Sequence, residues 1–149
     1  MRNLFFLVAV FLAVALTGLA RQPETIEELK TRAESAKIED RAVLYTEIAQ
    51  REVDAADKLF TDGKAEEGQA AVQDVVTYSE KASGVAMQTG KKLKQTEIGV
   101  RKMAARLRDI KRTLAFEDQA PVQTAVDRLE QLRTDLLSRM FGTKKGEQQ

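Results

Sequence analysis

The sequence predicts an all-α protein of about five helices, arranged as antiparallel hairpins in a helical bundle or a short stack. Apolar residues recur at helical intervals along most of the chain, and no stretch alternates apolar and polar residues as a strand does. Charged residues make up 32% of the chain, and the dominant types are those that form exposed helices. Only Pro23 and Pro121 interrupt the chain, so long uninterrupted helices are expected.

Residues 1–20 have the layout of a secretory signal peptide. Arg2 supplies positive charge, an apolar stretch follows, and small residues precede a cleavage site between Ala20 and Arg21. We therefore expect an exported protein, periplasmic or secreted, with one helical domain over 21–141 and a disordered tail over 142–149. The alternative is an uncleaved signal anchor that tethers the chain to a membrane, because the apolar stretch reaches the lower limit of about 17 residues for a spanning helix.

Start and stop signals define the first three expected helices. The first follows Pro23, where Thr25 and Glu28 are spaced as a capping box. The second covers about 40–60, and its broad apolar face suggests contact with two neighbouring helices. The third covers about 64–89 and ends at a glycine; many of its contact residues are small, which allows a close approach between helices.

The last two expected helices follow a heptad pattern. In the fourth, the residues that recur at intervals of seven are Leu93, Val100, Leu107 and Leu114, with Thr96, Met103 and Ile110 at the companion positions. In the fifth, Val122, Leu129 and Leu136 repeat in the same way. Asp118 is expected to cap this helix, with Pro121 in its first turn. A connector over 116–118 predicts that the two helices form an antiparallel pair.

A further pattern surrounds the turn at Gly63. It consists of a small residue (Ala56), a large apolar residue (Leu59), the turn glycine (Gly63), a second small residue (Gly68) and two valines expected to be buried (Val72 and Val75). This stretch resembles a single degenerate tetratricopeptide repeat, although that family prefers Ala at the position of Gly68 and closes its repeat with a Pro that is missing here. No second copy follows at a spacing of about 34 residues. The resemblance implies a helix-turn-helix and peptide binding of the kind those repeats perform; an ordinary antiparallel hairpin is the alternative.

Charge is segregated along the chain. Residues 22–90 contain fifteen acidic and eight basic residues, whereas 91–112 contains nine basic residues against Glu97 and Asp109. On the expected fourth helix, Lys94, Arg101 and Arg108 fall on one side, with Lys102 and Arg112 nearby. They are the candidate residues for binding an anionic lipid surface or polymer. The alternative is neutralisation within the protein by the acidic helices.

Side chains for catalysis are scarce. The chain contains no His and no Cys, which excludes an imidazole base, a thiol nucleophile and the common zinc sites. Adjacent acids such as Glu27 with Glu28 and Glu66 with Glu67 are better explained by the helix dipole, because neighbours on a helix point about 100° apart. We expect no catalytic residue, cofactor or metal. Nucleic acid is not an expected partner, since no aromatic residues alternate with the basic ones.

These observations favour an exported, non-catalytic scaffold or adaptor that works through protein–protein contacts. Self-association through the last two helices is compatible with this function. The alternative function is a cell-envelope module that binds anionic lipid or polymer through the basic helix 91–112. A hydrolase that uses carboxylates alone is the third hypothesis, and the least favoured, because a slim bundle without Trp seldom provides a sugar cleft.

Overall fold

The computed structural model describes residues 22–142; the expected signal peptide 1–20, its cleavage site at Ala20 and Arg21, and residues 143–149 lie outside the described residues. The described part consists of five α-helices, which are α2 (Ile26–Ser35), α3 (Ile38–Thr61), α4 (Ala65–Thr89), α5 (Leu93–Thr113) and α6 (Phe116–Phe141). Between residues 22 and 142 there is no β-strand. The all-α fold class predicted from the sequence is confirmed.

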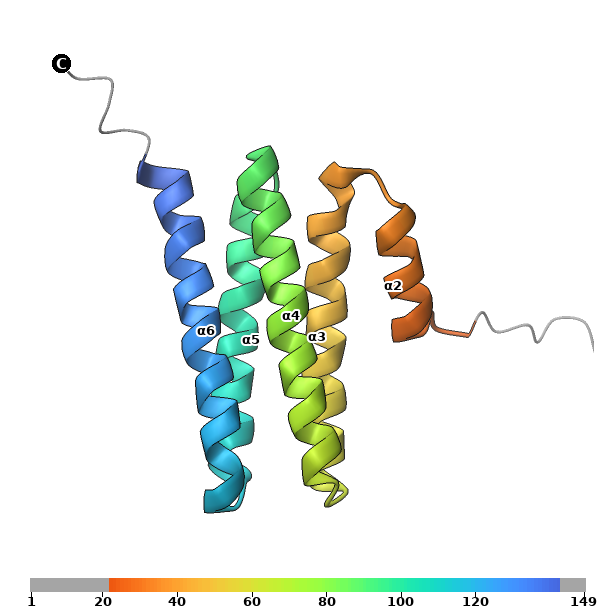
Figure 1. Ribbon diagram of the computed structural model, residues 1–149, viewed down its shortest axis with the longest axis vertical. Helices are drawn as coiled ribbons and strands as arrows, with labels where there is room; N and C mark the ends of the chain where they lie inside the picture. Colours follow the sequence, from red (N-terminus) through yellow and green to blue (C-terminus); the bar gives the residue numbers. More distant parts are fainter. Residues whose placement is uncertain (1–21, 143–149) are drawn as a thin grey trace, which may run out of the picture.

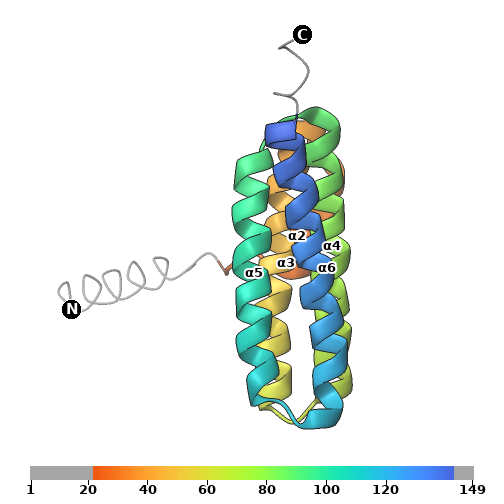
Figure 2. The ribbon, with the colours of Figure 1, turned by 90° about the vertical axis from the view of Figure 1, so that its left-hand side faces the viewer.

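Two helical hairpins form the body of the protein (Figure 1). The first is α3 with α4, and the second is α5 with α6. The hairpins pack side by side, so that α3 lies beside α5 and α4 lies beside α6, which gives a four-helix bundle (Figure 2). α4 and α5 follow each other in the sequence but touch only across a diagonal of the bundle. The short helix α2 packs outside, against α3 (Figure 1).

The ends of the first three helices follow the sequence signals. The Thr25 hydroxyl accepts a hydrogen bond from the Glu28 N–H (3.2 Å), and the Glu28 carboxylate accepts one from the Thr25 N–H (2.8 Å), so the predicted capping box is present. Gly63, between α3 and α4, has φ +75°, and Gly90, after α4, has φ +69°. Both therefore use the left-handed conformation that glycine adopts without strain.

The start of α6 differs from the prediction. The helix begins at Phe116, so Asp118 lies within its first turn, and the prediction that Asp118 caps the helix is wrong. Glu117 and Asp118 are favourable there because acidic side chains interact well with the positive end of the helix dipole. The Asp118 carboxylate instead accepts a hydrogen bond from the Gln69 side chain on α4 (3.1 Å). Pro121 lies inside the helix, beyond its first turn, where it removes one backbone donor.

The heptad residues of α5 and α6 fill the core of the bundle. Val100, Leu107, Val122, Leu129 and Leu136 are all fully buried. Their partners are on the facing helix and on the first hairpin, within a single continuous cluster. The central part of the heptad seam is thus buried within the chain, whereas Leu93 and Leu114 at its two ends are only half-buried. Any self-association must use the ends of the seam or other surfaces.

The α3–α4 pair forms the hairpin that the tetratricopeptide resemblance implies around Gly63. Its helices have 24 and 25 residues, so the hairpin is longer than a repeat of about 34 residues. At Gly68, a Cβ atom would lie 2.9 Å from the ring of Phe60. The Phe60 ring fills the space of the Ala side chain that the family prefers, and this packing accounts for the glycine.

Candidate functional site

The five basic residues singled out on α5 do not form one free stripe. Three arginines face carboxylates: Arg101 lies 3.8 Å from Glu97, Arg112 lies 3.0 Å from Asp109, and Arg108 pairs with Glu130 of α6. Within residues 22–142, Lys94 and Lys102 take part in no ion pair. The structure thus divides the predicted stripe into neutralised arginines and two free lysines.

Part of the neutralisation comes from α5 itself, which carries Glu97 and Asp109, and part comes from neighbouring helices. Arg106 pairs with Asp57 of α3, and Lys91, just before α5, pairs with Glu39 of α3. Glu97 of α5 also accepts a hydrogen bond from Arg133 of α6 (2.8 Å), which raises the pKa of the Arg133 guanidinium and leaves this carboxylate shared between two arginines. Exposed pairs such as these contribute little to stability. They do reduce the positive charge that most of α5 presents to a ligand.

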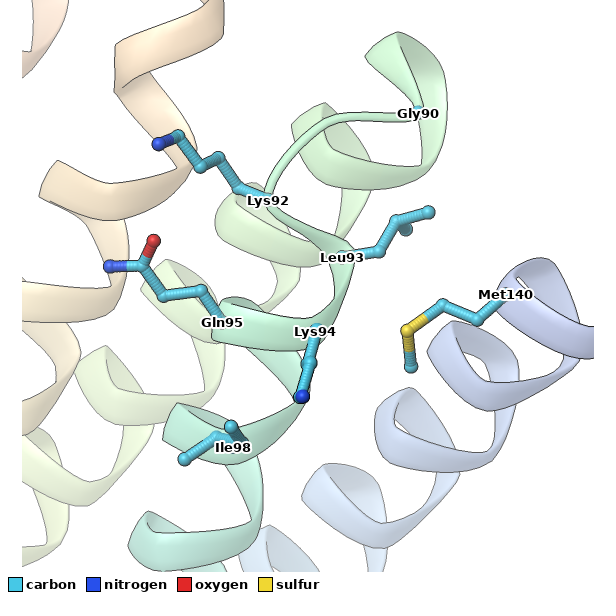
Figure 3. Close-up of a pocket in the computed structure, with 7 residues that line it drawn as sticks. All are labelled: Gly90, Lys92, Leu93, Lys94, Gln95, Ile98 and Met140. Atoms are coloured by element: carbon cyan, nitrogen blue, oxygen red, sulfur yellow. The ribbon is translucent and has the colours of Figure 1, made fainter.

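Three adjoining hollows follow α5, and together we call them the α5 groove. The first, of about 560 Å³, lies between the start of α5 and the end of α6, and is lined by Gly90, Lys92, Leu93, Lys94, Gln95, Ile98 and Met140 (Figure 3). The second lies between α3 and α5, and is lined by Val43, Thr46, Glu47, Gln50, Gln95, Ile98, Gly99 and Lys102. The third continues along the same two helices, and is lined by Gln50, Val53, Asp54, Lys102, Met103 and Arg106.

Shared residues make the groove continuous. Ile98 and Gln95 line both the first and the second hollow, while Gln50 and Lys102 line both the second and the third. From Leu93 to Arg106 the groove follows α5 for about 20 Å, at 1.5 Å per residue. It is therefore long enough to receive a helical segment of similar length.

The floor of the groove depends on a close approach between α3 and α5. A Cβ atom at Gly99 would lie 2.5 Å from the Cγ2 atom of Thr46, so only glycine fits at this point of α5. Thr46 is buried, and its hydroxyl donates to the Ala42 carbonyl oxygen (2.8 Å), which holds the side chain in place. Without a side chain at residue 99, the two helices meet closely beneath the groove.

The first hollow combines apolar walls with positive charge. Leu93 on α5 and Met140 on α6 point toward each other across it, and Ile98 lies one turn further along α5 (Figure 3). Lys92 and Lys94 stand at its edge, and neither belongs to an ion pair among the residues described. The first turn of α5 contains no acidic residue, and its N-cap residue makes no side-chain hydrogen bond. This end of the groove therefore suits an apolar group that carries negative charge beside it.

A second cluster of charged groups joins α2 to the first hairpin. The Lys30 ammonium lies 3.0 Å from Glu27, 3.5 Å from Glu52 and 3.9 Å from Asp74 of α4, and 5.3 Å from the ring centre of Tyr78. Burial raises the pKa of the Glu52 carboxyl, and the negative charge of Asp74 raises it further. Apart from the pair of Lys30 with Glu27 inside α2, these contacts hold α2 against α3 and α4, so the evident role of the cluster is structural.

Sequence reasoning identified Lys94 and Lys102 but missed the apolar residues of the groove. One signal was available in the sequence. Ile98 lies three positions after Gln95, on the side of the heptad helix that faces away from the seam, where polar residues are expected. Gly99 gave no signal of its own, because the residue that approaches it is 53 positions away in the sequence. Met140 belongs to the other end of the hairpin, and only the antiparallel pairing brings it to Leu93.

The fold and the groove define this chain as a helical bundle with an elongated surface groove along one helix. Comparisons with protein-family models, curated proteins and solved structures find no match. No helix in the described ranges is both long enough and apolar enough to cross a membrane. Residues 22–142 also contain no group of three or more side chains that could hold a metal ion.

Proposed function

We propose that this protein is an exported, non-catalytic scaffold or adaptor that binds a helical segment of a partner protein in the α5 groove. The observation that carries the proposal is the continuity of the three hollows along α5. A groove along a helix that combines apolar and charged lining residues suits an amphipathic helix, a kind of segment that many proteins bind in grooves. The proposal adds a defined binding surface, the α5 groove, to the sequence-based expectation of protein–protein contacts.

The lining of the groove defines the chemistry of this partner. Leu93, Ile98 and Met140 receive apolar side chains at one end, where Lys92 and Lys94 favour nearby acidic residues. On the α3 side the groove presents the negative charge of Asp54, whereas Glu47 is already paired with Arg51 (2.6 Å). An amphipathic helix with acidic residues toward α5 and basic residues toward α3 is therefore complementary, and a reversed helix would place like charges together.

Export rests on the signal peptide predicted over 1–20. Expression of the full chain in an exporting host, followed by mass measurement of the product outside the cytoplasm, tests this part of the proposal. A processed chain that begins at Arg21 supports it. An intact chain retained in the membrane supports the signal-anchor alternative, and an intact chain in the cytoplasm contradicts export.

Site-specific crosslinking tests the binding surface. We propose placing a photoreactive amino acid at Ile98, in the groove, and at Gln73, an exposed residue of α4, as a matched control. Crosslinking in native extracts should give a defined protein adduct at residue 98 and none at residue 73. The crosslinked segment of the partner, made as a peptide, should bind the purified chain, and Ile98→Glu should weaken this binding by tenfold or more, about 1.4 kcal/mol.

Two results would contradict the proposal. The first is a crosslinking pattern that is the same at residues 98 and 73, because the groove would then have no special role. The second is a peptide that binds the wild type and the Ile98→Glu variant equally. Circular dichroism of the variant serves as the control for folding, since Ile98 is only half-buried and its replacement should leave the bundle intact.

A further inference from the structure

One end of the bundle gathers exposed apolar residues. α3 and α5 begin at this end, and α4 and α6 finish there (top of Figure 1). Ile38, the first residue of α3, is 44% exposed, and Phe141, the last residue of α6, is 64% exposed. Phe116, at the start of α6, is the third exposed large apolar residue of the described chain, and it lies at the opposite end.

The same end is rich in positive charge. Its basic residues are Lys37, Arg41, Lys91, Lys92, Lys94 and Arg139, and its acidic residues are Glu34, Glu39 and Asp40. Lys91 is paired with Glu39, and the Arg139 guanidinium donates to the Met87 carbonyl oxygen (3.3 Å). In the part of the chain that the structure describes, Lys37, Lys92 and Lys94 are not paired with any carboxylate. We call this surface, with Ile38 and Phe141, the basic end.

The opposite end lacks this excess of positive charge. Asp62, Glu66 and Glu67 lie around the α3–α4 turn, and Glu117 and Asp118 lie in the first turn of α6. These five carboxylates share that end with four basic residues, namely Lys58, Lys64, Lys111 and Arg112. Charge is therefore nearly balanced there, so an anionic surface attracts the basic end more strongly than the other. This long-range orientation distinguishes the basic end from a set of scattered surface lysines.

We propose that the basic end rests on the surface of an anionic lipid bilayer. Phe141 and Ile38 enter the headgroup region, and the free lysines lie at the level of the lipid phosphates. The arrangement favours a bilayer over a second protein, because the exposed apolar residues project from helix ends at different corners of the bundle. The inference goes beyond the proposed function: Lys92 and Lys94 then meet lipid in place of the partner, and a bundle standing on its basic end offers a partner the α3–α5 part of the α5 groove on its flank.

Vesicle sedimentation tests the proposal. The chain from Arg21 to Gln149, which contains every described helix, is mixed with vesicles of phosphatidylcholine alone or with about 30% phosphatidylglycerol. We expect binding to the anionic vesicles only, with a steep loss as the salt concentration rises from about 0.05 to 0.5 M. Absence of binding to the anionic vesicles, or equal binding to both kinds, overturns the proposal.

Two pairs of matched variants separate the basic end from general charge and general hydrophobicity. Lys92→Glu with Lys94→Glu should lower the vesicle partition coefficient by about tenfold or more, because each lysine near such a surface contributes about fivefold. Lys64→Glu with Lys102→Glu makes the same change in net charge away from the basic end and should change partitioning less than twofold, about 0.4 kcal/mol. An equal loss in both double variants overturns the proposal.

The apolar pair tests insertion. Phe141→Ser should reduce partitioning several-fold, whereas Phe116→Ser, at the opposite end, should leave it unchanged. Circular dichroism confirms folding in each case, and all these positions are exposed. If Phe116→Ser reduces binding as much as Phe141→Ser, the bundle does not stand on its basic end. If the lysine variants lose the protein partner of the α5 groove but keep the vesicles, the basic end binds protein and the membrane proposal is wrong.

Discussion

The close contact between α3 and α5 predicts that Gly99→Ala destabilises the protein, although Ala is the better helix former. The new Cβ atom would lie 2.5 Å from Thr46 Cγ2, about 1 Å inside the separation at which carbon atoms attract. Overpacking of this kind costs about 1–3 kcal/mol, and the higher helix propensity of Ala returns about 1 kcal/mol. We therefore expect a net loss of about 1 kcal/mol in the free energy of unfolding, measured by urea denaturation with circular dichroism detection.

A second substitution makes this prediction specific. Thr46→Ser removes the Cγ2 atom, and the nearest remaining atom to the new Cβ is then Gln50 Nε2, at the ordinary distance of 3.6 Å. In the Thr46→Ser background, Gly99→Ala should stabilise the protein by about 1 kcal/mol, so the coupling between the two sites is about 2 kcal/mol. Gly84, which has open space around its Cβ position, is the control, and Gly84→Ala should stabilise by about 1 kcal/mol. If Gly99→Ala has the same effect in both backgrounds, the packing of α3 against α5 described here is incorrect.

Other predictions concern the core and the α2 cluster. Ser79 and Ser83 are fully buried, and their hydroxyls have no hydrogen-bond partner in the described part. Replacing either serine by Ala should therefore leave the free energy of unfolding unchanged or raise it by up to about 1 kcal/mol. A decrease of more than about 1 kcal/mol, measured by urea denaturation, would show that the hydroxyl has a partner. Leu129→Ala should cost about 2–5 kcal/mol in the same measurement, because the side chain is completely buried in the α5–α6 seam, and a cost below about 1 kcal/mol would contradict that seam. Burial and Asp74 raise the pKa of Glu52 in the folded state, so the folded protein keeps this proton at pH values where the unfolded chain has lost it. The stabilising contribution of Glu52 is thus present at low pH and is lost as the pH rises through the folded-state pKa. The stability of the wild type relative to Glu52→Gln should therefore fall as the pH rises above the ordinary carboxyl pKa of 4.5; a relative stability that rises with pH there would contradict the assignment.

The helices were predictable because their signals are local. The capping box at Thr25, the glycines after α3 and α4, and the heptads of α5 and α6 each lie within one or two turns of the structure that they specify. Where the prediction was wrong, two local signals competed. Asp118 is a good cap residue, but it is equally favourable in a first turn, and its hydrogen bond to Gln69 on another helix accompanies the earlier start.

The packing of the two hairpins was not predictable in the same way. Helical periodicity shows which face of a helix is apolar, but α3 can present that face to α5 or to α6 with the same pattern. The choice depends on contacts such as Gly99 with Thr46, which pair residues far apart in the sequence. The α5 groove exists only because of this choice, so its residues could not be grouped from the sequence alone.

The charged residues of α5 show the same limit of prediction from the sequence. The sequence placed Lys94, Arg101 and Arg108 on one side of a helix, and they are on one side of α5. Their partners decide which of them are free: Arg108 meets Glu130 of α6, whereas Lys94 lines the groove. The pair of Glu97 with Arg101 is different, because both residues lie on α5 at positions i and i+4 and the sequence shows that spacing. Spacing along one helix cannot reveal an acidic residue that arrives from another.

A disulfide between residues 46 and 99 tests the arrangement of the two hairpins most directly. The Cβ position at Gly99 lies 3.9 Å from the Cβ of Thr46, within the range of a disulfide, and the chain has no other cysteine. Oxidation of the Thr46→Cys, Gly99→Cys variant should give a monomer with one intramolecular disulfide, while Thr46→Cys with Gly84→Cys, where Gly84 is an exposed residue of α4, should keep both thiols free or crosslink between chains. Free thiols in the first variant, or the same yield of intramolecular disulfide in both, would show that α3 and α5 do not lie side by side and that the α5 groove is not formed.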